Sequence, residues 1–449
     1  MCTLYLFWWL RFWDFLRSWH NRRQEYAPLA VDLDDFARGG RDRASLDIRQ
    51  DLAGPKWLLG RLIAYSSLVL LGIYMLCTHE LPSDHRFKPR VQLANRVPKR
   101  EGYGTGEKIF IAASFYNNEL VLPYWTTEIT KLINYLGSDN VFVSIVESYS
   151  SDNSPALLRK FDQKLEVMGV PHRILTQDTS ITRPAPAGVS ISTSLARIEF
   201  LAAVRNLVME PLVAGGGYDR VLFSNDVFVQ SESMVELLST RDGDYDMACA
   251  LDFHNRGLYD LWVLRDRLGR LTSALWPYFL EDTGFRAVMA EEPAPVFTCW
   301  NGIVSILAEP FLPIALRHGR LSTSPLPRPL PPSHPAYPQW ANVTPALTPP
   351  LVFRASAPNE CFSSESFNLP YDLRRQFALE KIYVNPRVLT AYLWRYYLWF
   401  KIITRHWAVK WFMETVEKGD GIDLAKLVLG NPADVWPWDG GDCQPQPFG

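Results

Sequence analysis

Between residues 108 and 251, short apolar runs alternate with segments whose apolar residues recur at helical spacing. The apolar runs are 109–115, 141–146, 172–176, 221–223 and 247–251, and helical patterns cover 122–136, 154–168 and about 194–209. Strands that alternate with helices form a mostly parallel, doubly wound sheet. We therefore predict an α/β domain of Rossmann-like architecture.

Polar residues stand where these predicted strands end. They are Ser114, Glu147, Asp226 and Asp252. Carboxylates at the carboxyl edge of such a sheet are placed to bind ligands, and Asp226, after a short buried run, suits a divalent cation bound to a phosphate-bearing substrate. A turn cap is the alternative reading of Asp226. No GxGxxG or GxxxxGK[ST] pattern follows the strands, which argues against a dinucleotide enzyme and a P-loop ATPase.

Composition narrows the class further. The 449 residues are 47% hydrophobic, which is enough for a large core, and 46 Lys+Arg balance 48 Asp+Glu, so no nucleic-acid partner is expected. The six cysteines show no zinc spacing. Disulfides among the last four are possible in an oxidising compartment, but the spacing leaves their pairing open.

The apolar stretch 57–77 is short for a bilayer, and we predict that it is a transmembrane signal anchor. The alternative is a buried helix of a soluble protein. The resulting organisation is a cytosolic tail at 1–56, a stem at 78–107 and a lumenal domain at 108–449, interrupted by a proline-rich insertion at 318–350. Within the tail, residues 1–19 form either an amphipathic helix or a loose segment. The insertion carries the sequon at Asn342.

Several short motifs occur together in one order: NNE at 117–119, ESYSSD at 147–152, SNDV at 224–227, CWNG at 299–302 and ECFSSE at 360–365. In this order they resemble the fungal capsule-associated α-1,3-mannosyltransferases of the cryptococcal type, glycosyltransferase family 69. The resemblance covers about 108–388. It implies a GT-A-like fold and a type II membrane enzyme of the Golgi or endoplasmic reticulum. It also implies a GDP-mannose donor, Mn²⁺ or Mg²⁺ as cofactor, retention of configuration and a cell-wall or capsular glycan as acceptor.

The resemblance also distributes roles among the polar residues of the strand ends. Asp226 would bind the metal, with Ser224 at the position where the first acid of a DxD motif usually stands. The nucleotide sugar would be bound by Ser114, Asn117, Glu119, Glu147, Asp152, Arg197, Arg205 and Asn225. A guanidinium suits the diphosphate because it makes charge-assisted hydrogen bonds. The alternatives are a serine-rich turn around Glu147 and a solvent-facing helix position for Arg197.

The acceptor would be held by Tyr259, Arg265, Asp266, Trp300 and Asn301. Candidates for stabilising the transition state or orienting the acceptor are Asp252, Asp260, Glu360 and Glu365. A core position is the alternative for Trp300, and a solvated helical pair is the alternative for Arg265 and Asp266. In a retaining transfer the leaving phosphate can take the acceptor proton, so a dedicated general base is not required.

Two other functions remain open from the sequence. The single acid in the triplet at 224–226 is compatible with a catalytically weak scaffold or lectin-like partner in polysaccharide assembly. A transferase that uses another sugar nucleotide is chemically close, because a few pocket contacts decide specificity. The sequence predicts no oligomeric state.

Overall fold

The computed structural model describes residues 55–78, 82–185, 195–254, 257–274, 276–318, 321, 344–358, 360, 362–407 and 411. The predicted amphipathic segment at 1–19, most of the predicted tail, the sequon at Asn342 and most of the proline-rich insertion lie outside these residues. The helices are α2 Pro55–Thr78, α3 Pro82–Arg96, α4 Leu122–Leu136, α5 Ser154–Met168, α6 Leu195–Gly215, α7 Ser231–Leu238, α8 Asp282–Met289, α9 Glu365–Phe377 and α10 Trp394–Leu398.

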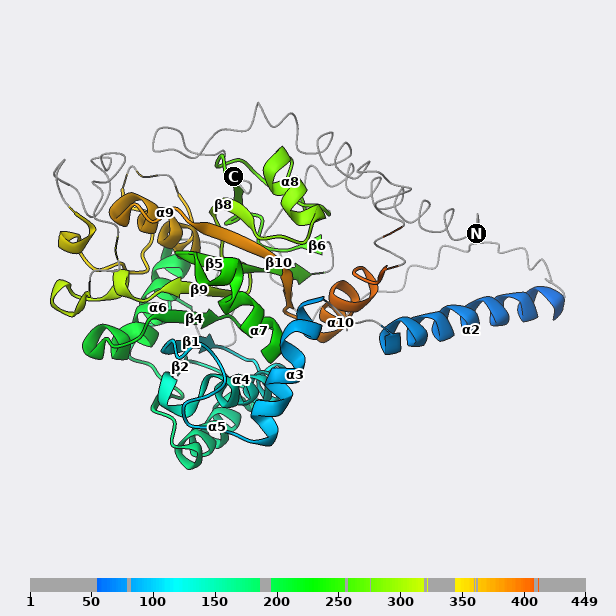
Figure 1. The fold of residues 1–449 in the computed structure, drawn as a ribbon, viewed down its shortest axis with the longest axis horizontal. Coiled ribbons are helices and arrows are strands. Elements are labelled where there is room, and N and C mark those ends of the chain that lie inside the picture. Colours follow the sequence, from blue (N-terminus) through cyan, green and yellow to red (C-terminus); the bar gives the residue numbers. More distant parts are fainter. Residues whose placement is uncertain are drawn as a thin grey trace.

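One sheet organises the described chain (Figure 1). Its strands are β1 Ile109–Phe115, β2 Val141–Glu147, β3 His172–Leu175, β4 Arg220–Ser224, β5 Met247–His254, β6 Gly257–Leu258, β7 Arg265–Asp266, β8 Ala294–Thr298, β9 Ile303–Leu307 and β10 Ile382–Ala391. They lie in the order β3-β2-β1-β4-β9-β5-β10-β8-β7, and β6 pairs with β5. The five apolar runs identified in the sequence are β1 to β5.

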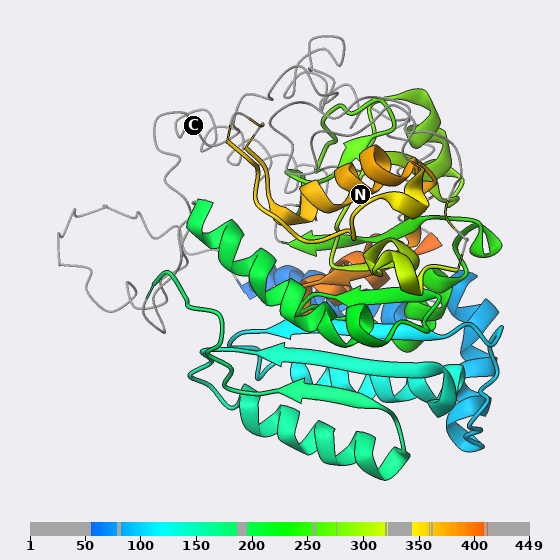
Figure 2. The same ribbon diagram turned by 90° about the vertical axis from the view of Figure 1, so that its left-hand side faces the viewer.

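Strand direction decides where the polar strand ends meet. β1 pairs in parallel with β2 and β4, and β2 pairs in parallel with β3, so the arrows of this half point the same way (Figure 2). β9 runs antiparallel between β4 and β5, which makes those two strands parallel to each other. β10 continues in parallel on β5. The carboxyl ends of β1, β2, β4, β5 and β10 therefore share one edge, where α/β sheets bind ligands.

Helices cover the sheet and bury the apolar stripe that their sequences carry. In α4, Trp125, Ile129 and Leu132 are fully buried, as the spacing of their positions requires. α6 packs on β1 and β2 and continues to Gly215, beyond the predicted end near residue 209. Each large apolar side chain buried in this way contributes about 1.5–3 kcal/mol.

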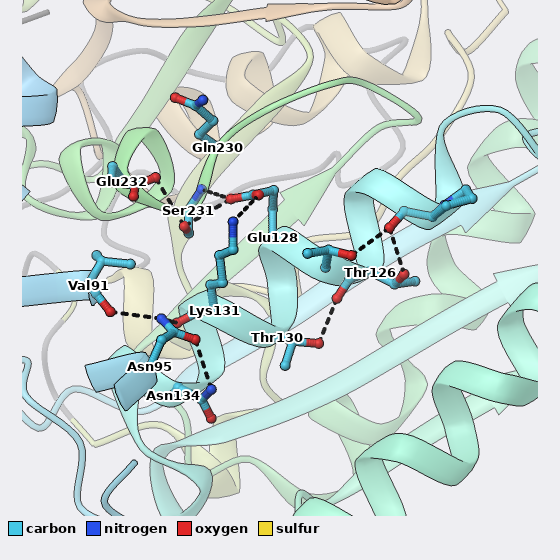
Figure 3. Close-up of polar contacts among 12 residues, drawn as sticks. Val91, Asn95, Thr126, Glu128, Thr130, Lys131, Asn134, Gln230, Ser231 and Glu232 are labelled. Carbon is cyan, nitrogen blue, oxygen red and sulfur yellow. Dashed lines mark hydrogen bonds and ion pairs between the residues drawn. The ribbon is translucent and has the colours of Figure 1, made fainter. Parts of the chain in front are cut away.

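The segment predicted to be a stem contributes a helix to the domain. α3 packs against α4 and α7, and its Phe87, Val91 and Ala94 belong to the buried core. Its Asn95 donates a hydrogen bond of 3.2 Å to the main-chain oxygen of Lys131 and accepts one of 2.9 Å from Asn134, both on α4 (Figure 3). The domain therefore begins before residue 108.

A second contact in Figure 3 fixes the start of α7, which follows the Asp226 segment. The Glu128 carboxylate of α4 accepts hydrogen bonds from the main-chain N–H and the hydroxyl of Ser231, at 2.9 and 3.0 Å. Its other oxygen pairs with Lys131 at 2.7 Å. A carboxylate at a helix N-terminus satisfies donors that lack intrahelical partners. Glu128 thereby fixes the chain only five residues after Asp226.

The predicted membrane-spanning helix is not upheld. α2 covers this segment and extends away from the sheet (Figure 1), but no helix in the part of the chain that the structure describes is both long and apolar enough to cross a membrane. The charge-free run extends only from residue 62 to residue 77. At about 1.5 Å per residue it covers about 24 Å of a hydrocarbon layer about 30 Å thick. On this finding, the prediction of a transmembrane anchor at 57–77 is wrong.

Candidate active site

Asp226 follows β4 and contacts the loop that follows β1. The side-chain amide of Asn118 donates a hydrogen bond of 2.7 Å to Oδ2 of Asp226. Asn118 is itself held in place, because its Oδ1 accepts from the N–H of Tyr116 at 2.7 Å and its N–H donates to the Ser154 hydroxyl at 2.8 Å. Ser154, the first residue of α5, thus anchors this loop. Burial raises the pKa of Asp226, and Asn118 and the charge of Arg205 oppose that rise.

Ser224 points away from this edge. Its hydroxyl is fully buried, accepts a hydrogen bond of 2.9 Å from the Trp125 indole and donates to the Asn225 carbonyl at 2.8 Å. Asp226 is therefore the acid that the triplet offers to a ligand. Among the described residues, no group of three or more His, Cys, Asp or Glu side chains is arranged to hold a metal ion.

The loops after β1 and β2 are locked together by reciprocal hydrogen bonds. The N–H of Glu119 donates to Asp152 at 2.9 Å, and the N–H of Asn153 donates to Glu119 at 3.1 Å. Asn117, in the left-handed region with φ of 53°, accepts from the N–H of Ser151 at 2.8 Å. Asparagine tolerates this conformation better than most residues. Three predicted nucleotide-binding residues, Asn117, Glu119 and Asp152, therefore lie on one joined rim beside Asp226, whereas Ser114 lies within β1 opposite Val146 of β2.

Glu147, the last residue of β2, holds the loops beside this rim in place. Its side chain is fully buried, and its two oxygens accept hydrogen bonds from the N–H groups of Ser150 at 3.0 Å and Gln177 at 2.7 Å. Tyr149, which lies between Glu147 and Ser150 in the chain, has φ of 60°. In this arrangement Glu147 shapes the loops after β2 and β3, and both of its carboxylate oxygens are already engaged.

Two carboxylates, Asp252 and Asp260, form a pair. Asp252 lies near the end of β5, and Asp260 lies in the segment after β6. Asp252 is fully buried, and its Oδ1 accepts from Asn301 at 2.8 Å and from the N–H of Asp260 at 3.3 Å. Gly302, with φ of 76°, lets the chain pass this point, because a Cβ there would lie 2.1 Å from the Thr390 hydroxyl. Burial raises the pKa of Asp252 to about 6, and burial together with the Asp252 charge raises that of Asp260 well above its ordinary value.

Tyr392 joins the carboxylate pair to the segment that carries Asp226. Its hydroxyl donates to Oδ2 of Asp252 at 3.5 Å and accepts from the Asn225 amide at 3.2 Å. Asn225 also accepts from the Trp300 indole at 3.2 Å. β10 continues to Ala391 and ends beside β5, so Tyr392 directly follows this strand. Tyr392 was not among the site residues predicted from the sequence.

Arg205 brings a positive charge to the same region. It is buried, forms an ion pair of 3.1 Å with Glu365 and donates a hydrogen bond of 2.6 Å to Ser366. Its guanidinium lies 4.8 Å from the centre of the Trp300 ring. The positive charge of Arg205 opposes the rise in the pKa of both Asp226 and Asp260. Arg197, earlier on α6, is exposed, and its charge acts on Tyr259.

Glu360 lies in a separate ion-pair network. Both of its oxygens are bound by the Arg354 guanidinium, at 2.6 and 2.9 Å, and the same guanidinium holds Asp372 at 2.6 and 2.9 Å. Bidentate pairs of this kind are strong and geometrically specific. The structure brings Glu365, but not Glu360, to Arg205 beside the Asp252–Asp260 pair.

The predicted acceptor residues are divided between surface and core. Tyr259 is 54% exposed. Trp300 and Arg265 are buried, and Arg265 donates to the carbonyls of Leu261 and Leu264 at 2.9 and 2.8 Å. Burial lowers the pKa of Arg265 to about 10. Asp266 is also buried and closes a tight turn, accepting from the N–H groups of residues 268 and 270 at 2.8 and 2.9 Å. Asn301, the fifth predicted acceptor residue, is fully buried, so Tyr259 is the one of the five side chains that is open to an acceptor in this conformation.

A family profile described as Cryptococcal mannosyltransferase 1 matches residues 108–372, more than half of the chain. The chain belongs to this family. This membership confirms the resemblance seen in the motifs. The match spans β1 to β9 and most of α9, and so includes Asp226, Asp252, Asp260 and Glu365.

Individual relatives are more distant. The chain is 27% identical over 223 residues to the alpha-1,3-mannosyltransferase CMT1 of Cryptococcus neoformans var. neoformans serotype D. That alignment covers 43% of this chain and 45% of the relative, so the chain spans about half the length of the relative that it matches.

Solved structures with similar chains include the mannosyltransferase PcManGT from Pyrobaculum calidifontis in complex with GDP-Man and Mn²⁺. It is 12% identical with a TM-score of 0.32, covering 81% of this chain and 82% of that one. S. aureus TarS is also 12% identical, with a TM-score of 0.34 and coverage of 63% and 60%. TM-scores this low do not establish the fold, which follows from the strand order of the chain itself.

Proposed function

We propose that this protein transfers mannose from GDP-mannose to a mannose-containing glycan, forming an α-1,3 linkage with retention, in the synthesis of cell-wall or capsular polysaccharide. The observation that carries the proposal is the overlap of the family match with the carboxyl edge of the sheet. There Asp226, the Asp252–Asp260 pair and the Arg205–Glu365 pair converge, each supplied by a different element.

The donor set suits a hard divalent cation, Mn²⁺ or Mg²⁺, at Asp226. Burial raises the pKa of this carboxylate, so its negative charge is under-compensated by the protein alone. Such ions often bind through one or two carboxylates together with substrate phosphates and water. When bound, the cation would neutralise charge on the leaving diphosphate. Asn118 holds the orientation of Asp226, and Arg205 adds positive charge to the same region.

Bond changes in the proposed transfer are balanced without a protein general base. The bond between the anomeric carbon and the phosphate oxygen breaks, and the acceptor oxygen bonds to that carbon on the same face. The acceptor hydroxyl proton passes to the leaving phosphate, and GDP departs. Burial favours the protonated form of both acids, and the Asp252 charge favours it further at Asp260, so a protonated Asp260 would donate a hydrogen bond to a sugar hydroxyl.

The lumen of the secretory pathway, in the Golgi or the endoplasmic reticulum, is our proposed location. Its support is a disulfide between Cys249 on β5 and Cys299, which lies between β8 and β9. Disulfides persist in oxidising compartments and are rare in the cytosol.

Donor turnover tests this function directly. The purified chain is incubated with GDP-mannose, UDP-glucose or UDP-galactose and a mannose-containing acceptor, with and without Mn²⁺, and nucleotide release and glycan product are measured. We expect release from GDP-mannose, loss of turnover in Asp226→Asn, and little effect of the surface control Asp139→Asn. Turnover of a UDP-sugar would assign another donor. Acceptor binding without any turnover would favour the lectin-like alternative, and equal rates in Asp226→Asn would remove Asp226 from the mechanism.

A further inference from the structure

Four aromatic rings form a continuous row that leads away from the Asp252–Asp260 pair. The Tyr392 ring lies 5.1 Å from that of Tyr259, which lies 5.4 Å from His254, which in turn lies 5.1 Å from Tyr396. His254 ends β5 and Tyr259 follows β6, whereas Tyr392 follows β10 and Tyr396 lies on α10, so the fold assembles the row from two distant parts of the sequence. Tyr259 is 54% exposed, and the other three side chains are partly exposed.

The inner end of this row is attached to the candidate active site. The Tyr392 hydroxyl donates to Asp252 at 3.5 Å, and the main-chain N–H of Tyr259 donates to the Asp252 carbonyl at 2.9 Å. Burial and the charges of Asp260 and Asp252 raise the pKa of Tyr259, and Arg197 opposes this rise. Tyr259 therefore lies next to the carboxylate pair, between the Tyr392 and His254 rings.

The chemistry of the row suits a carbohydrate chain. Aromatic faces carry partial negative charge and accept the C–H face of a sugar ring, while tyrosine hydroxyls and imidazole nitrogens bond its hydroxyls. At the outer end the Arg395 guanidinium lies 4.8 Å from the centre of the Tyr396 ring and adds further donors. Three ring-to-ring steps give the row room for more than one sugar ring.

We propose that Tyr392, Tyr259, His254 and Tyr396 form an acceptor track that binds successive sugar units of a mannose-containing oligosaccharide. The proposal rests on the proposed function and deepens it, because it assigns the enzyme an extended acceptor with at least one sugar beyond the unit that is modified. Tyr259 contacts the sugar nearest the carboxylate pair, and Tyr396 contacts a more distant one.

Binding without turnover provides the test. Calorimetry of the full chain with α-1,3-linked mannotriose and with methyl α-mannoside compares a long ligand with a single sugar. Wild type is expected to bind the trisaccharide more tightly than the monosaccharide. Tyr396→Ala should weaken trisaccharide binding about threefold to tenfold and leave monosaccharide binding unchanged, whereas Tyr259→Ala should weaken both. Tyr396→Trp retains an aromatic face and should restore the preference for the longer ligand.

Trp407→Ala is the matched control, since this ring is 67% exposed and lies outside the row. Thermal midpoints of all variants establish that they fold. An unchanged ratio of the two affinities in folded Tyr396→Ala, or no preference for the trisaccharide in wild type, would overturn the track. GDP release from GDP-mannose in the presence of the trisaccharide is measured in parallel: its absence in wild type would count against the proposed function, while the binding ratios would still decide the track.

Discussion

The Asn118 amide donates a hydrogen bond of 2.7 Å to the carboxylate of Asp226, although 108 residues separate them in the chain. The contact joins the loop after β1 to the end of β4, two parallel neighbours in the sheet. It also fixes which oxygen of Asp226 is engaged by the protein. Oδ2 accepts from Asn118, and Oδ1 is therefore the oxygen we expect to serve a cation.

Removing that amide should impair donor turnover more than stability. Hydrogen bonds to charged groups contribute about 1.5–3 kcal/mol, so Asn118→Ala is expected to reduce turnover roughly ten- to hundredfold and to raise the Mn²⁺ concentration needed for half-maximal rate. Titration of Mn²⁺ in initial-rate assays measures both effects. The control is Asn95→Ala, which removes a comparable amide at the α3–α4 contact and should leave the Mn²⁺ requirement unchanged. Identical Mn²⁺ curves for Asn118→Ala and wild type would contradict this role.

Substitutions in the Arg205–Glu365 ion pair distinguish the effect of an unpaired buried charge from the effect of lost packing. Arg205→Met leaves Glu365 buried without its partner, which should destabilise the fold by about 3–5 kcal/mol. The double variant Arg205→Met with Glu365→Leu removes the orphaned charge and should regain most of that loss. Urea unfolding measures stability, and nucleotide release measures activity, which we expect to stay low in both. Equal stabilities of the single and double variants would show that the charge imbalance is not the cause.

Asp252 predicts a pH dependence with a defined sign. Its pKa is raised to about 6 in the folded protein, from 3.8 unfolded, so the folded state binds the extra proton between these values and loses stability as pH rises through them. Asp252→Asn should therefore stabilise the protein at pH 7.5 by on the order of 3 kcal/mol, and the gain should vanish near pH 4. Unfolding midpoints at both pH values test this, with the exposed Asp282→Asn as control. A gain that is the same at both pH values would argue against a raised pKa.

The Cys249–Cys299 disulfide closes a loop with a sequence separation of 50 residues. In the loop-entropy description this stabilises the fold by about 4 kcal/mol. The paired substitution Cys249→Ser with Cys299→Ser should lower the thermal midpoint to that of the reduced wild type. Scans with and without dithiothreitol measure it. The paired variant should not respond to the reductant; a response would place another disulfide in the chain.

Packing of α3 predicts that the domain needs residues before 108. Phe87 is buried against α4 and α7, and Phe87→Ala should cost about 3–5 kcal/mol through lost contacts and the cavity left behind. The exposed Leu93→Ala on the same helix is the matched control, with an expected change below about 0.5 kcal/mol. Comparable losses for both variants would indicate a general effect on the helix rather than burial.

Local patterns predicted the first half of the sheet well. β1 was predicted with its observed bounds, and Asp226 and Asp252 were expected to meet because the carboxyl ends of parallel strands share an edge. Hydrophobic spacing is a short-range signal, and here each strand and helix is a local unit. The predicted anchor at 57–77 was wrong, because its charge-free run is too short to cross a bilayer despite its apolar character.

Long-range partners decide the roles that the sequence could not give. Glu360 and Glu365 are five residues apart in similar surroundings, yet Arg354 takes the first and Arg205 takes the second. The apolar run before Trp300 is compatible with both an acceptor contact and a core position for this residue. Only its contacts with Phe223 and Phe353 show that it lies in the core. Tyr392 could not be tied to Asp252 without knowing that β10 lies beside β5.

The antiparallel strand β9 has a mechanical consequence. It is hydrogen-bonded to β4 on one side and to β5 on the other, so the strand that carries the Asp226 segment and the strand that carries Asp252 are cross-linked through a shared backbone ladder. Hinge closure between a donor half and an acceptor half would have to break that ladder. In the proposed transfer, we therefore expect any closing motion to come from the loops at the sheet edge, with the spacing between the two carboxylate positions unchanged.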